Sequence, residues 1–305
     1  MAKNKITRVK RKKTELFDVV NNILVVLITL IVIYPLYFCV IASFSRPSQV
    51  ALGKTLLWVK DFTLDAYKYV FQEKQLWIGY RNSIIYLVLG TLYNLVLTIP
   101  AAYVMTKKYL PLRGPLSWYY FITMYIGGGM IPTYLLIKNL GLIDNPLVLI
   151  IGSGVSCYNL IVTRQYFSSS IPQDIFDAAY IDGASELSCF TRIAMPLAKP
   201  IIAVMTLYYG VGHWNSYYGA LLYIRKSVYY PLQLVLRNIL ISNELSLAGI
   251  ENADAETVAY MLYVAEMAQG MKYAIVFIAS APLLVAYPFV QKHFTKGIMI
   301  GSVKG

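Results

Sequence analysis

Residues 19–45 read VVNNILVVLITLIVIYPLYFCVIASFS and contain no Lys, Arg, Asp or Glu. A helix needs about 20 apolar residues to cross the hydrocarbon core of a bilayer, so this run is long enough to span a membrane. Five further charge-free runs of similar length follow along the chain: 82–106, 114–137, 145–163, 200–224 and 273–291. The six runs predict an all-α membrane protein with six transmembrane helices.

The composition of the whole chain agrees with this fold class. Of its 305 residues, 58% are hydrophobic and only 14% are charged, whereas about a quarter of the residues in a soluble domain carry a charge. A membrane β-barrel is excluded because its strands would give short alternating segments rather than long apolar runs. The first run is also too long for the apolar part of a cleaved signal peptide, so we expect it to remain as the first helix.

The orientation in the membrane follows from the positions of Lys and Arg. Residues 1–18 form a basic tail that carries seven of them. With this tail in the cytoplasm, the cytoplasmic segments hold 16 Lys and Arg and the external segments hold 11. The positive-inside bias therefore predicts that both termini are cytoplasmic, that 165–199 is a cytoplasmic loop and that 225–272 is an external loop. This bias also explains the net charge of +12 without nucleic acid.

The external loop contains the stretch ADAETVAYMLYVAEMAQG, residues 253–270, whose apolar residues recur at helical spacing. It predicts an external helix. The helix could lie against the membrane or a partner protein, and a packed lid without a partner is an equal alternative.

The chain lacks the residue groups that catalysis would require. Its two histidines, His213 and His293, lie far apart, and its three cysteines are scattered. No Cys/His cluster has the spacing of a metal site, and the apolar runs hold no Asp, Glu, Lys or Arg for a proton relay. We therefore expect no enzyme activity and no catalytic, metal or cofactor-binding residues. Energy for uphill transport must come from another protein.

The loop between the fourth and fifth spans reads SSSIPQDIFDAAYIDGASELSCFTRIAMPLAKP, residues 168–200. It predicts two short helices joined by a turn. Pro172 suits a first helical turn, and Gly183 permits the left-handed conformation that ends a helix. The second helix is expected over 184–193, with Pro196 ending it. The first helix offers a small apolar surface for the groove of another protein, formed by Ile175, Phe176, Ala178 and Ala179.

This loop resembles the EAA loop of permease subunits in bacterial ABC importers. The matching residues are Asp177, Ala178, Ala179, Asp182, Gly183, Ala184, Phe190, Ile193 and Pro196. Asp177 replaces the usual Glu, and Met195 stands where Leu is frequent; the first keeps the charge and the second keeps the apolar character. The resemblance implies the type I importer permease fold, with a loop helix that docks in a cleft of an ATPase subunit and couples it to transport.

Other motifs resemble the carbohydrate-uptake branch of this family, which includes the maltose permease, and its subgroup of complex-oligosaccharide permeases. They are Tyr34-Pro35, residues 127–129 (GGG), Trp214-Asn215, Tyr287-Pro288 and the tail 296–305. The resemblance implies a bacterial cytoplasmic membrane protein with an oligosaccharide substrate and lipid contacts. Its implied partners are a second homologous permease, two ATP-binding cassette subunits that bind the ATP, and an extracytoplasmic solute-binding protein. The rival interpretation is a self-sufficient secondary transporter or channel for a small polar solute.

Span five is rich in aromatic and polar residues that suit a sugar path. At about 100° per residue, one stripe of this helix holds Tyr208, Gly212, Asn215 and Gly219, with Tyr218 at its edge. We expect Tyr208, Trp214, Asn215 and Tyr218, with Tyr125 from span three, to line the path. Helix packing is the alternative, and it is favoured for the two glycines. Residues 127–129 are expected to break or bend span three.

Overall fold

The computed structural model describes residues 16–245, 267 and 270–285, and within these residues no β-strand occurs. Two described helices, Phe17–Ser43 and Lys74–Val104, are long and apolar enough to cross a membrane alone. Strongly bent helix pairs bring the number of such spans within the described residues to four at most. Two further apolar helices are shorter, Leu232–Ile241 and Gly270–Val285.

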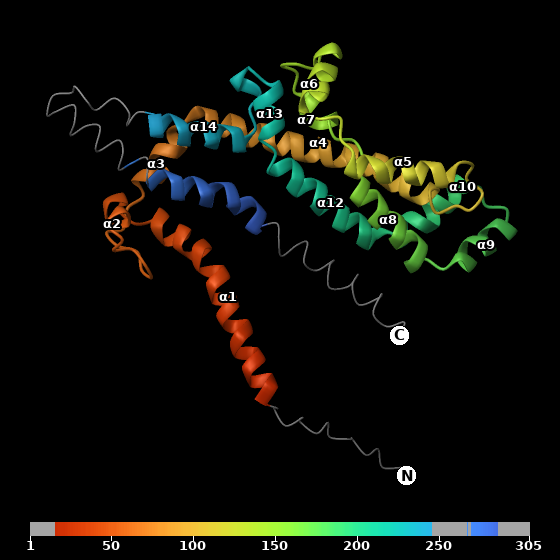
Figure 1. Cartoon of the computed structure of the whole chain (residues 1–305), viewed down its shortest axis with the longest axis horizontal. Coiled ribbons are helices and arrows are strands. Elements are labelled where there is room, and N and C mark those ends of the chain that lie inside the picture. Colours follow the sequence, from red (N-terminus) through yellow and green to blue (C-terminus); the bar gives the residue numbers. More distant parts are fainter. Residues whose placement is uncertain (1–15, 246–266, 268–269, 286–305) are drawn as a thin grey trace, which may run out of the picture.

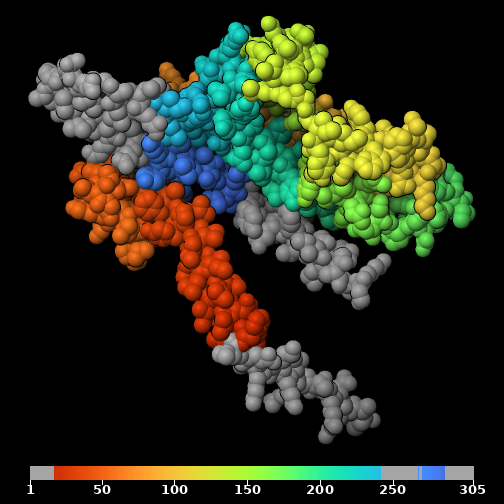
Figure 2. Space-filling view, in the orientation of Figure 1, coloured from red at the N-terminus to blue at the C-terminus, as the bar shows by residue number. Residues whose placement is uncertain are grey.

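The first helix, α1 (Leu16–Ser43), projects away from the rest of the protein (Figures 1 and 2). Its residues 17–37 are all exposed, although almost all of them are apolar. A helix that is apolar on every side and exposed requires lipid or another membrane subunit around it. Two short helices, α2 (Pro47–Ala51) and α3 (Asp65–Gln72), then lead to the second span.

The central helix of the fold is α4 (Lys74–Val104). It packs along α8 (Cys157–Ser170), α12 (Lys199–Trp214) and α14 (Leu232–Leu245). Glycine at position 90 allows α4 to approach α12 closely, because a Cβ there would lie 2.3 Å from the ring of His213. Gly79 plays a similar role beside Leu232 of α14 (Leu232–Leu245). Helices α8, α12 and α14 are therefore arranged around α4.

Span three is broken, as the three glycines predict. It consists of α5 (Arg113–Tyr125) and α6 (Met130–Asn139), which meet at an angle of 113°. Gly129 has φ +85°, a conformation that glycine adopts at little cost. Figure 1 shows α6 standing off from the end of α5. The bend expected at residues 127–129 is confirmed.

Spans four and five also differ from the continuous helices that their charge-free runs suggest. Span four consists of α7 (Leu147–Ile151) and α8 (Cys157–Ser170), separated by residues 152–156. Span five ends at Trp214 as α12 (Lys199–Trp214), and α13 (Tyr218–Tyr223) is a separate short helix. Asn and Ser compete for backbone hydrogen bonds and favour helix ends, which accounts for the interruption after Trp214.

Two regions that the sequence distinguishes lie partly outside the described residues. The expected external helix at 253–270 is one of them, and the end of the sixth span is the other. Within 225–272 the structure describes η2 (Ser227–Tyr229) and α14, a helix for which the sequence analysis made no prediction. The helix Gly270–Val285 occupies the start of the sixth run. Each of the six charge-free runs thus contains helix within its described residues, and the fold is an all-α membrane architecture.

Candidate functional site

The loop with the EAA-like pattern, here called the coupling loop (residues 171–198), begins with helix α9 (Gln173–Ile181). Pro172 precedes the helix and Asp182 caps its end. Gly183 follows with φ +76°, and the N–H of Ala184 donates to the carbonyl of Ala179 at 2.9 Å. The helix–turn arrangement predicted around Gly183 is confirmed.

The second helix of the coupling loop extends further than expected. It begins with α10 (Glu186–Ser188), continues as the π-helix Cys189–Ala194 and ends with α11 (Met195–Leu197). Pro196 therefore lies inside the helical stretch, and the chain bends by 77° only after Leu197. A proline clashes with the carbonyl four residues earlier in a regular helix, and the wider π turn before Pro196 is an interruption of the kind that absorbs such a clash.

One face of the coupling loop packs inward against the ends of α4, α8 and α12. Phe176 is buried, and its ring centroid lies 6.0 Å from that of Tyr103. Phe190 contacts the same tyrosine with a centroid distance of 5.1 Å. The partly buried residues that join this cluster include Ala179, Ala184 and Ile193. This inner face fixes the loop to the spans.

The outer face of α9 is exposed. Ala178 and Ile181 lie one helical turn apart on it, and Ile181 is 87% exposed. Asp177 and Asp182 are also exposed, as is Leu187 in the second helix. The apolar surface expected from the sequence is therefore divided: Ile175 and Ala178 face outward, whereas Phe176 and Ala179 pack inward.

A buried cation joins α4 to the coupling loop. Lys107, three residues beyond the end of α4, is only 7% exposed. Its Nζ lies 4.4 Å from the ring centroids of both Tyr103 and Phe176. The same Nζ donates to the Tyr180 hydroxyl at 2.8 Å and lies 3.5 Å from Oε2 of Glu186. Aromatic faces and a carboxylate are the groups that compensate a buried ammonium.

The carboxylate of Glu186 is the common acceptor of this cluster. Tyr103 donates to it at 3.2 Å, and the hydroxyls of Tyr109 and Tyr180 donate to its other oxygen. Burial raises the pKa of Glu186, but the hydrogen bonds from the three tyrosines and the Lys107 charge outweigh this effect and lower its pKa overall. Burial and the neighbouring carboxylate raise the pKa of Tyr109 to about 12. We call Lys107, Glu186, Tyr103, Tyr109, Tyr180 and Phe176 the lysine cage.

The sequence did not reveal the lysine cage. Lys107 directly follows the charge-free run 82–106, so it was counted as one more residue of the positive-inside bias. Glu186 stands in the loop without any local partner that spacing would indicate. A lysine at the very end of a span and an acidic residue inside the EAA-like loop are the only signals that could have pointed to it.

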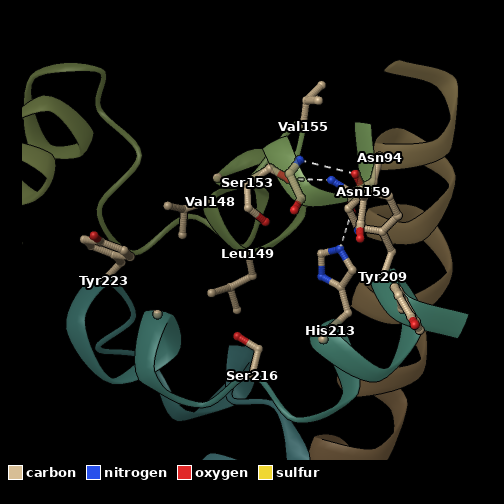
Figure 3. A pocket seen from close by; sticks show the side chains of 15 residues that line it. Asn94, Val148, Leu149, Ser153, Val155, Asn159, Tyr209, His213, Ser216 and Tyr223 are labelled. Atoms are coloured by element: carbon tan, nitrogen blue, oxygen red, sulfur yellow. Dashed lines mark hydrogen bonds between the residues drawn. The ribbon is translucent and has the colours of Figure 1, made fainter. Parts of the chain in front are cut away.

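The five residues expected on the sugar path do not gather at one place. Tyr208 lines a cavity of about 410 Å³ between α4, α7, α8 and α12 (Figure 3). Trp214 is buried and donates from Nε1 to the carbonyl of Ala279 at 3.1 Å. Tyr125, Asn215 and Tyr218 are exposed and lie outside the lining of this cavity. Both Gly212 and Gly219 line the cavity, and a Cβ on Gly212 would meet no atom within 4 Å.

Within the described part of the chain, no group of three or more His, Cys, Asp or Glu side chains could hold a metal ion. The charged residues of the coupling loop are instead exposed, and Glu186 among them pairs with Lys107. The geometry is that of a helical connector with one fixed face and one free face.

Comparison with known proteins identifies the family. The model of the binding-protein-dependent transport system inner membrane component matches residues 76–300. The chain is 40% identical to Protein LplC of Bacillus subtilis (strain 168) over 294 residues, which cover 96% of this chain and 97% of that protein. It is 35% identical to the polygalacturonan/rhamnogalacturonan transport system permease protein YtcP of the same organism over 298 residues, which cover 96% and 100%.

A solved structure has the same fold. It is described as a bacterial ABC transporter involved in the import of the acidic polysaccharide alginate, and one of its chains superposes with a TM-score of 0.80 at 30% identity. The match covers 94% of this chain and 100% of that chain. The chain therefore belongs to the family of binding-protein-dependent transport system inner membrane components, as a multi-pass permease subunit of an ABC importer with the type I permease fold.

Proposed function

We propose that this chain forms one half of a heterodimeric permease that moves an oligosaccharide across the bacterial cytoplasmic membrane. Two ATPase subunits supply the energy, and an extracytoplasmic solute-binding protein delivers the sugar. The names of relatives support an oligosaccharide as the substrate. YtcP, for example, is named for the transport of polygalacturonan and rhamnogalacturonan. The observation that supports an ATPase contact is the exposed outer face of α9.

The outer face of α9 suits a groove of another protein. Ile175, Ala178 and Ile181 recur every three residues on one side of the helix and are exposed. A short helix with exposed apolar residues binds by placing this side in a hydrophobic groove. Because the inner side is fixed by the lysine cage, a displacement of α9 by an ATPase would also displace the end of α4. The coupling loop thus links ATP hydrolysis to movement of the spans.

The proposed orientation places the tail 1–18, the coupling loop and the C-terminus in the cytoplasm. The loop 225–272 then faces outward and contacts the solute-binding protein. Glu251, Asp254 and Glu256 make the middle of this loop acidic, which would complement a basic patch on that partner. These three residues lie outside the described part of the chain, and the proposal for them is supported by their charge alone.

The sugar path is proposed to run beside span five. Tyr208 and Tyr218 offer exposed rings for stacking on sugars, Tyr125 does so from span three, and Asn215 offers an amide. Trp214 is buried, so we assign it the role of holding the end of α12 in place rather than touching the sugar.

Purification of the tagged chain from its native membrane tests the proposed function. We expect an ATPase and a second permease to copurify, and the reconstituted assembly should take up oligosaccharide only with ATP and the binding protein. The rival interpretation is a secondary transporter or channel. It predicts that the chain alone takes up solute, driven by an ion gradient or a concentration gradient. Uptake by the chain alone without ATP, together with no copurifying ATPase, would overturn the proposal.

A further inference from the structure

The interruption of span four forms one wall of the cavity that Tyr208 lines. Residues 152–156 separate α7 from α8, and Gly152, Ser153, Val155 and Ser156 all line the cavity. Non-helical backbone at membrane depth is tolerated where protein groups satisfy it or where it borders an aqueous cavity. The volume of about 410 Å³ lies within the range of small-molecule sites.

Hydrogen bonds hold this wall in a fixed shape. The side-chain amide of Asn94, which is fully buried, donates to the carbonyls of Ser153 and Gly154, the latter at 2.7 Å. Its oxygen must then be the acceptor for Nε2 of His213, which lies 2.7 Å away. The hydroxyl of Tyr209 accepts from the N–H of Ser156 at 3.2 Å. Figure 3 shows these groups converging at the interruption. The Asn94 amide and Nε2 of His213 thereby hold the structure together.

Asn159 differs from these residues because its side chain has no such task. It lies in the first turn of α8, lines the cavity and is only 7% exposed. Within the described residues its amide makes no hydrogen bond. Because Asn159 lines the cavity, the donors and the acceptor of its amide are available to a group bound there. The α8 N-terminus beside it also has no side-chain cap.

The remaining lining defines the chemistry of the ligand. Tyr208 supplies an aromatic ring, Ser216 supplies a hydroxyl, and Gly212 leaves the wall between them open. None of the described residues that line the cavity is Asp, Glu, Lys or Arg. Amide, hydroxyl and aromatic groups recognise the hydroxyls and the apolar face of a sugar ring, whereas a carboxylate would ordinarily be paired with Arg or Lys.

We propose that this cavity binds one neutral sugar ring of the transported oligosaccharide, with Asn159 donating and accepting hydrogen bonds to its hydroxyls. The inference rests on the proposed function and adds to it a site in this subunit and a preference for an uncharged ring. Asn159 and Ser216 are new assignments. Tyr208 is the one residue that this site shares with the path expected from the sequence.

The test uses the complete transporter with its ATPases and binding protein, reconstituted in liposomes. Uptake is measured with a radiolabelled neutral pyranose trisaccharide and with a uronate trisaccharide. Asn159→Leu keeps the size of the side chain and removes its hydrogen bonds. We expect this variant to raise the KM for the neutral probe by about tenfold, the magnitude of one lost buried hydrogen bond to a ligand hydroxyl. Its unfolding temperature should not fall, because no protein hydrogen bond is lost.

A matched control lies one turn along the same helix. Thr163 is fully buried, does not line the cavity and bonds only to the carbonyl of Asn159. Thr163→Val should therefore leave the KM at the wild-type value. A second variant, Gly212→Val, narrows the cavity at a position where an added Cβ would meet no atom within 4 Å, and it should also raise the KM for the neutral probe.

The outcomes separate this inference from the proposed function. An unchanged KM in both Asn159→Leu and Gly212→Val, with normal ATP-dependent uptake by the wild type, would overturn the binding site and leave the proposed function intact. A KM effect confined to the uronate probe would overturn the preference for a neutral ring. Absence of ATP-dependent uptake of both probes by the wild-type assembly would contradict the proposed function, and this inference with it.

Discussion

Nζ of Lys107 lies 3.5 Å from Oε2 of Glu186, and this ion pair connects the end of α4 to the second helix of the coupling loop. The lysine side chain is almost completely buried, whereas that of Glu186 is 44% exposed. A buried ammonium is stable only when charge and hydrogen-bond acceptors surround it. The lysine cage supplies both, so the pair defines how the coupling loop sits on the spans.

Lys107→Met should weaken this attachment. Methionine would fill the aromatic cage, but Glu186 would lose its counter-charge. Because that carboxylate is partly exposed, we expect a loss of about 1–2 kcal/mol, below the range for fully buried pairs. The measurement is the unfolding temperature of the purified chain, together with ATP-dependent uptake by the assembly. Lys108→Met is the matched control, since Lys108 is the exposed neighbour. Equal unfolding temperatures for the two variants would contradict the structural role of Lys107.

The lysine cage also predicts a dependence of stability on pH. The pKa of Glu186 is lower in the folded chain than its ordinary 4.5, so its contribution is present above pH 4.5 and is lost as the pH falls through the folded pKa. The pKa of Tyr109 is raised from 10.0 to about 12, so its contribution is complete below pH 10 and is lost as the pH rises towards 12.

Thermal unfolding of the wild type and of Glu186→Gln across pH 3–11 checks this dependence. The difference between the two proteins should be constant from about pH 5 to 9 and should shrink below pH 4.5, where the wild-type carboxylate also becomes neutral. A difference that persists undiminished at pH 3 would show that the charge of Glu186 does not stabilise the fold.

The sequence predictions that the structure confirms were based on the charge-free runs and on glycines that permit unusual backbone conformations. The runs located the apolar helices because charged residues cannot remain in hydrocarbon without large cost. The glycines at 127–129 and at 183 marked a break and a turn because these positions need conformations that other residues avoid. These features depend on a few neighbouring residues, so they can be read locally.

Features that depend on contacts between helices could not be predicted in this way. Asn94 stabilises the interruption of span four through carbonyls about sixty residues away in the chain, and no local pattern indicates that pairing. Likewise, Ala178 and Ala179 are neighbours in a helix of nine residues, and the sequence does not show which of the two faces the spans. The position of Phe176 in the lysine cage decides it.

Ile181→Lys should disrupt the proposed ATPase contact without disturbing the coupling loop. Its side chain is 87% exposed, so the lysine should be accepted by the fold while it places a charge in an apolar groove. We expect at least a tenfold loss of copurified ATPase at unchanged unfolding temperature. Thr191→Lys, exposed on the second helix, is the control. Ala179→Lys is less informative because Ala179 packs inward. Wild-type ATPase content in Ile181→Lys would exclude this face as the contact.

Gly90→Ala should destabilise the packing of α4 on α12. A Cβ at this position would lie 2.3 Å from the His213 ring, which is itself held by Asn94 and has little freedom to move. Overpacking of this kind costs about 1–3 kcal/mol, partly offset by the better helix propensity of alanine. Gly210→Ala is the control, since the nearest atom would be 3.7 Å away. If the two alanine variants unfold at the same temperature, the close approach at Gly90 is not a constraint on packing.

Gly183→Val should uncouple ATP hydrolysis from transport. The glycine has φ +76°, and a Cβ there would meet no atom within 4 Å, so the cost comes from the backbone alone. A residue with a side chain pays about 1–2 kcal/mol in this conformation, and a β-branched residue is the least suited to it. The turn should therefore open and move α9 relative to the second helix.

Gly183→Asn is the matched control because asparagine tolerates the left-handed region. We expect the valine variant to insert and to pair with its partner permease, yet to lose ATPase binding or to hydrolyse ATP without sugar uptake. The asparagine variant should retain most of the uptake. Wild-type uptake and ATPase content in Gly183→Val would show that this turn does not set the position of α9, and the coupling role of the loop would lose its support.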